Sequence, residues 1–190
     1  GCIFIGLPIW FVIGILVTFS PEFAKVMEIE GTVAAGDAVM FSYIGLAVGD
    51  MSSGFISQWL QSRKKVVFWF IMMTFAFILY YLFLPVKSLY FFYGACFTLG
   101  VGIGYWALFV TIAAEQFGTN LRSTVATSVP NFIRGTVVPL TIFFKYLRGE
   151  VGVIQGALIV GIITIIIALI SLRSIDETFG RDLNFLEKDN

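Results

Sequence analysis

The stretch VGVIQGALIVGIITIIIALISL at residues 151–172 contains no charged residue along its whole length. A helix needs roughly 20 apolar residues to cross about 30 Å of hydrocarbon, so this segment is long enough to span a membrane. Strands of a membrane barrel would be about 10 residues long and alternating, so the apolar runs of the chain predict an all-α integral membrane protein instead. The six predicted transmembrane helices are near 2–20, 38–60, 66–85, 89–114, 124–146 and 151–172.

The composition agrees with this class of protein. Hydrophobic residues are 58% of the 190 and charged residues only 13%, and the mean hydropathy is +0.94. The net charge is zero and no basic run is interleaved with aromatics, so we expect no nucleic acid as partner. Histidine is absent, and Cys2 and Cys96 lie in apolar segments as small buried residues would. We therefore expect no metal site and no cofactor.

Basic residues are distributed unequally between the two sets of turns. Six crossings put both ends of the chain on one side, and the turns near 61–65 and 115–123 lie on that side with the tail. This set carries seven basic residues, against four in the opposite set. Because basic residues favour the cytoplasm, we expect both ends in the cytoplasm of a multi-pass protein of the cell inner or plasma membrane. The seven are Arg63, Lys64, Lys65, Arg122, Arg173, Arg181 and Lys188, and the four are Lys25, Lys87, Lys145 and Arg148.

The turns are short and no Pro/Ser-rich linker divides the chain, so we expect one six-helix bundle over 1–175, followed by a cytoplasmic tail at 176–190. The triplets 1–85 and 89–175 have opposite topologies, which predicts two inverted three-helix repeats. The first apolar run begins at once after Gly1, without a flanking charge. We therefore expect the chain to be part of a longer protein.

Small residues spaced by four predict packing seams on two of the helices. Gly45, Gly49 and Ser53 lie in the second predicted helix, and Gly100 and Gly104 in the fourth. Such spacing puts small side chains on one face, where two backbones can approach closely.

Asp50 and Arg134 are the two charges placed in the middle of predicted spans. Each is about 10 residues from the cytoplasmic end of its helix, which at 1.5 Å per residue puts both about 15 Å deep. A charge at this depth costs several kcal/mol unless it is paired or hydrated, so both residues indicate a function. They could form one structural ion pair, or line a watery path in which the carboxylate binds a proton and the guanidinium an anion.

The helix that carries Arg134 is polar on one face. Thr127, Asn131 and Arg134 share this face, which is unfavourable in lipid and should turn toward protein or water. The two interpretations are the lining of a cavity and hydrogen bonding between helices.

Three aromatic residues with polar tips lie well inside their spans. Trp10 follows Pro8, and Tyr105 and Trp106 follow a glycine run. A cavity wall would use such groups to stack against and orient a ligand, and core packing explains them equally well.

Four short motifs resemble one family of carriers in their order and sidedness. GFISQWLQSRKK at 54–65 resembles the loop signature of the major facilitator superfamily, with Gln58 and Trp59 where the family has an acidic and a basic residue. AAEQFGTNLRST, with Glu115 and Arg122, is similar to the turn between the tenth and eleventh helices of that family. PNFIRG is similar to an Asn and Arg pairing in the eleventh helix, and DETFGRDL resembles the ETKGRSL-like tail of sugar-porter relatives. The resemblance implies the carboxyl-terminal half of a twelve-helix carrier.

The resemblance also implies a function, which is secondary active transport of a small polar solute by alternating access, as a symport with protons among the candidate ions. The implied partners are the solute, the lipid bilayer and an amino-terminal six-helix half. The first and fourth helices would face the cavity, and the second and fifth would border the other half. The implied substrate or coupling-ion residues are Asp50, Arg134, Asn131, Trp10, Tyr105 and Trp106, and the implied cytoplasmic gate contacts are Arg63, Lys64, Glu115 and Arg122.

Two other classes of function compete with transport. A self-contained six-helix protein could act as a homodimer, channel or scaffold, although a channel should show a repeated ring of charge that this sequence does not offer. An intramembrane enzyme would need Asp50 and Glu115 to act together, and their different depths argue against such a dyad. We therefore do not expect an enzyme.

Overall fold

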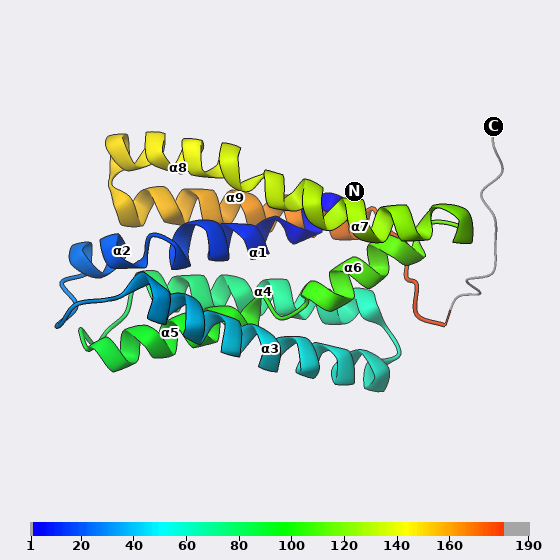
Figure 1. Cartoon of the computed structure of the whole chain (residues 1–190), viewed down its shortest axis with the longest axis horizontal. Helices are drawn as coiled ribbons and strands as arrows, with labels where there is room; N and C mark the ends of the chain where they lie inside the picture. Colours follow the sequence, from blue (N-terminus) through cyan, green and yellow to red (C-terminus); the bar gives the residue numbers. More distant parts are fainter. Residues whose placement is uncertain (1, 181–190) are drawn as a thin grey trace.

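The computed structural model describes residues 2–180, and the described chain is helical, with one isolated bridge between Glu30 and Ser88 in place of any strand (Figure 1). Arg181, Lys188 and residues 181–190 of the predicted tail lie outside the described part. The elements are a 3₁₀ helix η1 (Cys2–Gly6), α1 (Leu7–Phe11), a π-helical segment η2 (Val12–Val17), α2 (Ser20–Val26), α3 (Ala35–Leu60), α4 (Arg63–Leu82), α5 (Leu89–Gly102), α6 (Trp106–Glu115), α7 (Thr119–Gly135), α8 (Val137–Val151) and α9 (Val153–Arg173).

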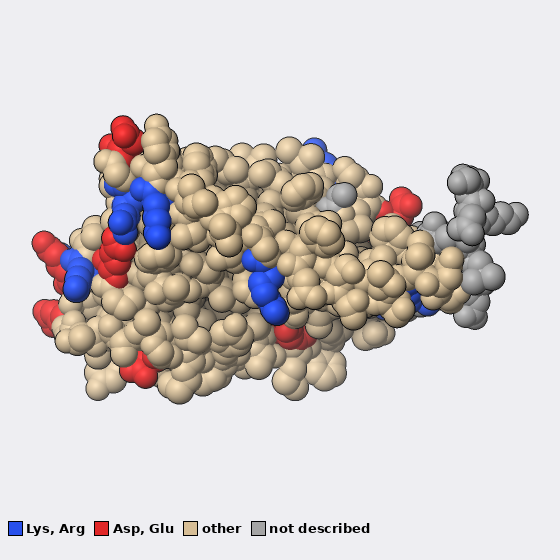
Figure 2. Space-filling model, turned by 45° about the horizontal axis from the view of Figure 1, so that its top comes forward, with Lys and Arg blue, Asp and Glu red and all other residues tan. Residues whose placement is uncertain are grey.

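The helices run along one axis in two layers, with α3, α4 and α5 in one layer and α8 and α9 in the other (Figure 1). The α3–α4 turn, the α6–α7 turn and the end of α9 lie at one end of the bundle, which we call the Arg63 end. We call the opposite end, with α2 and the α8–α9 turn, the Glu22 end. Charged side chains gather at the Glu22 end, and only isolated charges interrupt the middle of the face in Figure 2. There Arg148 of α8 donates to the carboxylate of Glu22, 2.5 Å away.

Several helices are long and apolar enough to cross a membrane, which makes this a multi-pass membrane protein. Four such spans are Ala35–Leu60, Arg63–Leu82, Leu89–Glu115 and Val153–Arg173. Cys2–Val17 and Ser20–Val26 would form a fifth, bent by 64°. The sequence predicted a sixth at 124–146, where the structure has α7 and α8, and α7 is rich in Thr, Ser and Asn. The six-span count and the inverted repeat therefore stay predictions.

Three of the predicted spans are discontinuous, which the apolar pattern did not indicate. The first combines 3₁₀, α and π turns, the fourth is interrupted at 103–105, and the fifth is interrupted at Thr136. Pro139 has no N–H to donate to the carbonyl of Gly135, which accounts for the third interruption. Each interruption releases backbone groups from the helical ladder and lets the chain change direction.

The predicted close packing of the small residues is confirmed. A Cβ on Gly45 would lie 2.1 Å from the carbonyl oxygen of Phe97, and one on Gly100 would lie 2.0 Å from that of Ser42. The Ser42 hydroxyl donates to the carbonyl of Cys96 at 3.1 Å across the same contact. The backbones of α3 and α5 therefore touch, and glycine is required at both crossings.

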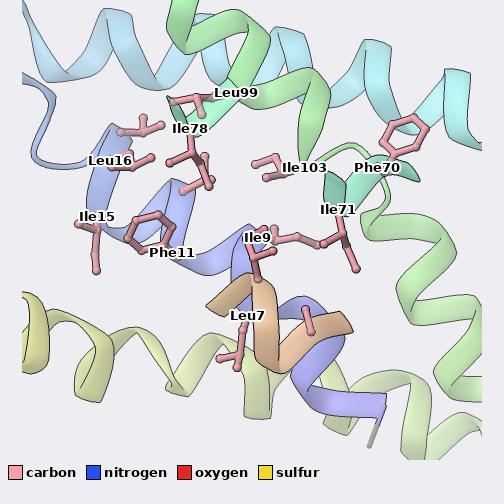
Figure 3. Close-up of a cluster of buried hydrophobic side chains, with 14 of the residues drawn as sticks. Leu7, Ile9, Phe11, Ile15, Leu16, Phe70, Ile71, Ile78, Leu99 and Ile103 are labelled. Atoms are coloured by element: carbon pink, nitrogen blue, oxygen red, sulfur yellow. The ribbon is translucent and has the colours of Figure 1, made fainter. Parts of the chain in front are cut away.

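The buried core joins the irregular first span to α4 and α5 (Figure 3). The hydroxyl of Tyr81, which is fully buried, donates to the carbonyl of Leu16 at 2.9 Å inside the π-helical segment. This bond satisfies a carbonyl that lies outside regular helical geometry, so α4 supports the first span where that span is irregular. The core residues labelled in Figure 3 are Leu7, Ile9, Phe11, Ile15, Leu16, Phe70, Ile71, Ile78, Leu99 and Ile103.

Candidate functional site

A cavity of about 110 Å³ lies where α1, η2, α3, α6 and α7 approach one another. Three of the predicted site residues, Trp10, Trp106 and Arg134, line it together. Tyr43 of α3 joins them and was not predicted, although it precedes Asp50 by seven residues, which is two helical turns on the same face. The remaining lining is apolar and comes from Ile9, Ile13 and Leu46.

Two indoles and one guanidinium define the chemistry of this cavity. The rings of Trp10 and Trp106 meet edge to face, with centroids 5.8 Å apart and planes at 81°. The guanidinium carbon of Arg134 lies 5.3 Å from the ring centroid of Trp10, within the range of a cation–π contact. The indole Nε1–H of Trp10 is buried without a hydrogen-bond partner in the described structure. A buried donor of this kind is unfavourable until an acceptor arrives.

The discontinuous helices place these three side chains. Trp10 lies two residues before the π-helical segment Val12–Val17, Trp106 is the first residue of α6 after the interruption, and Arg134 lies two residues before Thr136. Interrupted helices often form the binding sites of membrane carriers, because the released backbone and the change of direction bring polar groups together at mid-depth. Here the three interruptions converge on one cavity.

Asp50 lies beside this cavity and outside its lining. A carboxylate oxygen of Asp50 accepts a hydrogen bond from the backbone N–H of Ala107 at 3.1 Å, in the first turn of α6. A Cβ on Gly104 would lie 2.3 Å from the Cα of Gly49, so the glycine contact brings Asp50 to this helix terminus. The ion pairs among residues 2–180 do not include Asp50 with Arg134. The carboxylate is held instead by the N-terminal dipole of α6.

The structure separates Tyr105 and Asn131 from the other site residues. Tyr105 is fully buried, and its hydroxyl donates to the carbonyl of Ile5 at 3.0 Å, so it supports the first span. The amide nitrogen of Asn131 donates to the carbonyl of Thr127 at 2.9 Å, one turn earlier in α7. Asn131 lines a separate shallow hollow on the exposed side of α7.

The predicted gate residues lie together at the Arg63 end. The guanidinium of Arg63 forms an ion pair with the carboxylate of Glu115, whose side chain is only 9% exposed. The ammonium of Lys64 donates to the carbonyls of Arg173 at 3.2 Å and Ile175 at 2.7 Å, which closes the C-terminus of α9. Arg122 donates to the carbonyl of Phe117 at 3.4 Å.

Glu177 belongs to this network and was not among the predicted gate residues. Its carboxylate accepts from the Ser62 hydroxyl and from the backbone N–H of Arg63 at 3.0 Å and of Lys64 at 3.2 Å. Burial raises the pKa of Glu177, but the hydrogen bonds from Ser62, Phe179, Arg63 and Lys64 outweigh it, so the pKa lies below its ordinary value. Glu177 therefore caps α4 from the segment after α9. Its place in the DETF motif was the available signal.

Comparison of the chain with protein-family models, with curated proteins and with solved structures finds no match. The described residues contain no group of three His, Cys, Asp or Glu side chains that could hold a metal ion. The geometry alone defines a multi-pass helical membrane protein with a small aromatic and cationic cavity at the interruptions of its helices.

Proposed function

We propose that this chain is the carboxyl-terminal half of a secondary active transporter of the major facilitator type, and that it moves a small anionic solute by alternating access. The observation that carries the proposal is the pair of donors in the cavity. The guanidinium of Arg134 lies over the ring of Trp10, and the indole N–H of Trp10 has no acceptor in the described structure. A carboxylate or phosphate could accept from both donors, and the indoles would pack against its apolar part.

The size of the cavity supports a half-site. Pockets for small molecules usually enclose about 300–1,000 Å³, and this one encloses about 110 Å³. Arg134 and Asn131 are exposed on α7, and a charge and an amide that face lipid are unfavourable. A second six-helix half against α3 and α7 would enlarge the site and cover these residues.

Asp50 takes the coupling role in this proposal. It has no basic partner within 4.0 Å in the described chain, so protonation would not break an ion pair. Its hydrogen bond to Ala107 joins the carboxylate to α6, whose first residue, Trp106, lines the cavity. A proton on Asp50 would weaken that bond and so affect the position of Trp106.

The contacts at the Arg63 end form the cytoplasmic gate in this proposal. The ion pair of Arg63 with Glu115 ties α4 to α6, and Lys64 and Glu177 tie α4 to the end of α9. A carrier that opens to the cytoplasm has to move this end of the bundle away from the other half. The contacts named here hold α4, α6 and the end of α9 together, so that they move as one rigid unit.

The test is uptake of labelled small carboxylates and phosphates by cells or vesicles that contain the complete protein. We expect Arg134→Ala to reduce uptake about tenfold to a hundredfold, since a hydrogen bond to a charged group contributes about 1.5–3 kcal/mol. Lys145→Ala, an exposed cation on α8 away from the cavity, is the matched control and should retain uptake. Full uptake by both Arg134→Ala and Arg134→Lys would remove Arg134 from the site.

The same assay, repeated over a range of pH, tests Asp50. Asp50→Asn keeps an oxygen that can accept from Ala107, so the fold should be retained while the pH dependence of uptake is lost. Unchanged uptake with an unchanged pH profile would show that Asp50 does not couple transport to protons.

For the gate, the double reversal Arg63→Glu with Glu115→Arg should recover part of the uptake that either single reversal removes.

A further inference from the structure

A groove of about 570 Å³ lies at the Arg63 end, between the start of α4 and the end of α9, far along the bundle from the aromatic cavity. Its floor is apolar and is formed by Phe68, Trp69, Leu169 and Leu172. Trp69 is 65% exposed there, and its ring contacts Phe68 edge to face. An indole at the end of a membrane span is typical of the level of the lipid headgroups.

The rim of the groove carries an excess of positive charge. Lys64, Lys65 and Arg173 line it, together with one carboxylate, that of Glu177. The oxygens of Glu177 already accept hydrogen bonds at the start of α4. The side chains of Lys65 and Arg173 are exposed, and no hydrogen bond or ion pair engages them within residues 2–180. Two cations are therefore available to an anion in this groove.

Each of these free cations stands above an apolar stripe on its own helix. Trp69 follows Lys65 by one helical turn on the exposed face of α4. On α9, Ile166 and Ile170 are 50% and 61% exposed and lead along one face to Arg173. A basic group above an apolar stripe matches a molecule with an anionic head and hydrocarbon chains.

We propose that this groove binds one anionic phospholipid of the bilayer. Its phosphate would lie between Lys65 and Arg173, and its acyl chains would follow Trp69 and the isoleucines of α9 along the bundle. Basic pockets between the ends of transmembrane helices bind anionic headgroups in this way, and a zwitterionic head brings its own cation and gains less. The site is separate from the solute cavity, so it does not depend on the proposed transport.

The test is native mass spectrometry of the purified full chain with phosphatidylglycerol or phosphatidylcholine of equal acyl length. We expect at least about tenfold preference for phosphatidylglycerol, and loss of that preference in Lys65→Ala with Arg173→Ala. The matched control, Lys25→Ala with Lys145→Ala, removes two exposed cations at the Glu22 end and should keep it. Equal binding of both lipids, or an equal loss of the preference in the control variant, would overturn the proposal.

A second measurement does not require the charge variants to fold. Brominated acyl chains quench the fluorescence of nearby tryptophan. The fluorescence of Trp69 is the part that is lost in Trp69→Phe, and the quenching of this part reports lipid at the groove. We expect brominated phosphatidylglycerol, as a minor component in phosphatidylcholine vesicles, to quench this signal more strongly than brominated phosphatidylcholine does. No difference would contradict the proposal. Inorganic phosphate should not reverse the quenching, and reversal by millimolar phosphate would show a free-anion site instead.

Discussion

Gly100 of α5 lies against the backbone of α3, and its missing side chain sets the distance between the two helices. A methyl group there would lie 2.0 Å from the carbonyl oxygen of Ser42, and a backbone atom cannot rotate out of the way as a side chain can. We expect Gly100→Ala to lower the free energy of unfolding by about 1–3 kcal/mol or more, through forced separation of α3 and α5. Thermal unfolding in detergent measures the change.

Gly94 provides the control for this prediction on the same helix. A Cβ at Gly94 would meet nothing within 4 Å, and alanine is a better helix former than glycine. Gly94→Ala should therefore leave the unfolding temperature unchanged or slightly higher. Equal destabilisation by the two substitutions would mean that helix propensity, and not the contact with Ser42, decides the result.

Single residues were predictable where spacing alone decides, and not where a helix is interrupted. The spacing of Gly45, Gly49, Gly100 and Gly104 predicted close approach of backbones at these positions, and the structure adds that the two series meet each other. Tyr105 and Trp106 were both predicted to line the cavity, and the structure places only Trp106 there, with Tyr105 turned toward Ile5. Nothing in the pattern indicates which of them turns inward to the first span, because the turn of the chain at 103–105 decides this.

At the scale of helices, the apolar runs predicted where spans lie and did not predict where they are interrupted. Hydropathy measures the transfer of side chains into lipid. An interruption depends instead on hydrogen bonds between its backbone and other elements, such as the bond from the Tyr81 hydroxyl to the carbonyl of Leu16. The Pro139 interruption has a local cause that the sequence contains. The interruption near Gly104 depends on the approach of α3, which is not local.

The cap of α4 by Glu177 gives the prediction at this scale. Since the pKa of Glu177 lies below its ordinary value of 4.5, the folded state favours the ionised form. The stability that this carboxylate adds is therefore present above about pH 4.5 and is lost as the pH falls through the lower, folded pKa. We expect Glu177→Gln to lower the unfolding temperature at pH 7 and to reduce its decrease on acidification. Asp176→Asn, a change of an exposed neighbouring carboxylate, should leave both unchanged. Identical acid profiles for Glu177→Gln and the parent chain would contradict this role.

At the scale of the whole molecule, the turns that the sequence assigned to one side of the membrane lie at one end of the bundle. The α3–α4 and α6–α7 turns and the end of α9 share the Arg63 end, and the α8–α9 turn lies at the other end (Figure 1). Four crossings therefore separate Lys65 from Asp176 if α7 and α8 together form one span. The polar composition of α7 leaves this open to experiment, because an interfacial position of α7 and α8 would reduce the crossings to three.

Single cysteines, placed in a chain with Cys2→Ala and Cys96→Ala, decide between these arrangements by their labelling with a membrane-impermeant maleimide. We expect Lys25→Cys and Glu150→Cys to be labelled in intact cells, and Lys65→Cys and Asp176→Cys only after permeabilisation, since basic turns stay in the cytoplasm. All four positions are exposed in the structure, so failure to label in intact cells reports the membrane and not burial. Labelling of Lys65→Cys and Asp176→Cys from opposite sides would reject the six-span arrangement, and with it the half-carrier and the cap of α4 by Glu177, because all three need Lys65 and Asp176 on one side.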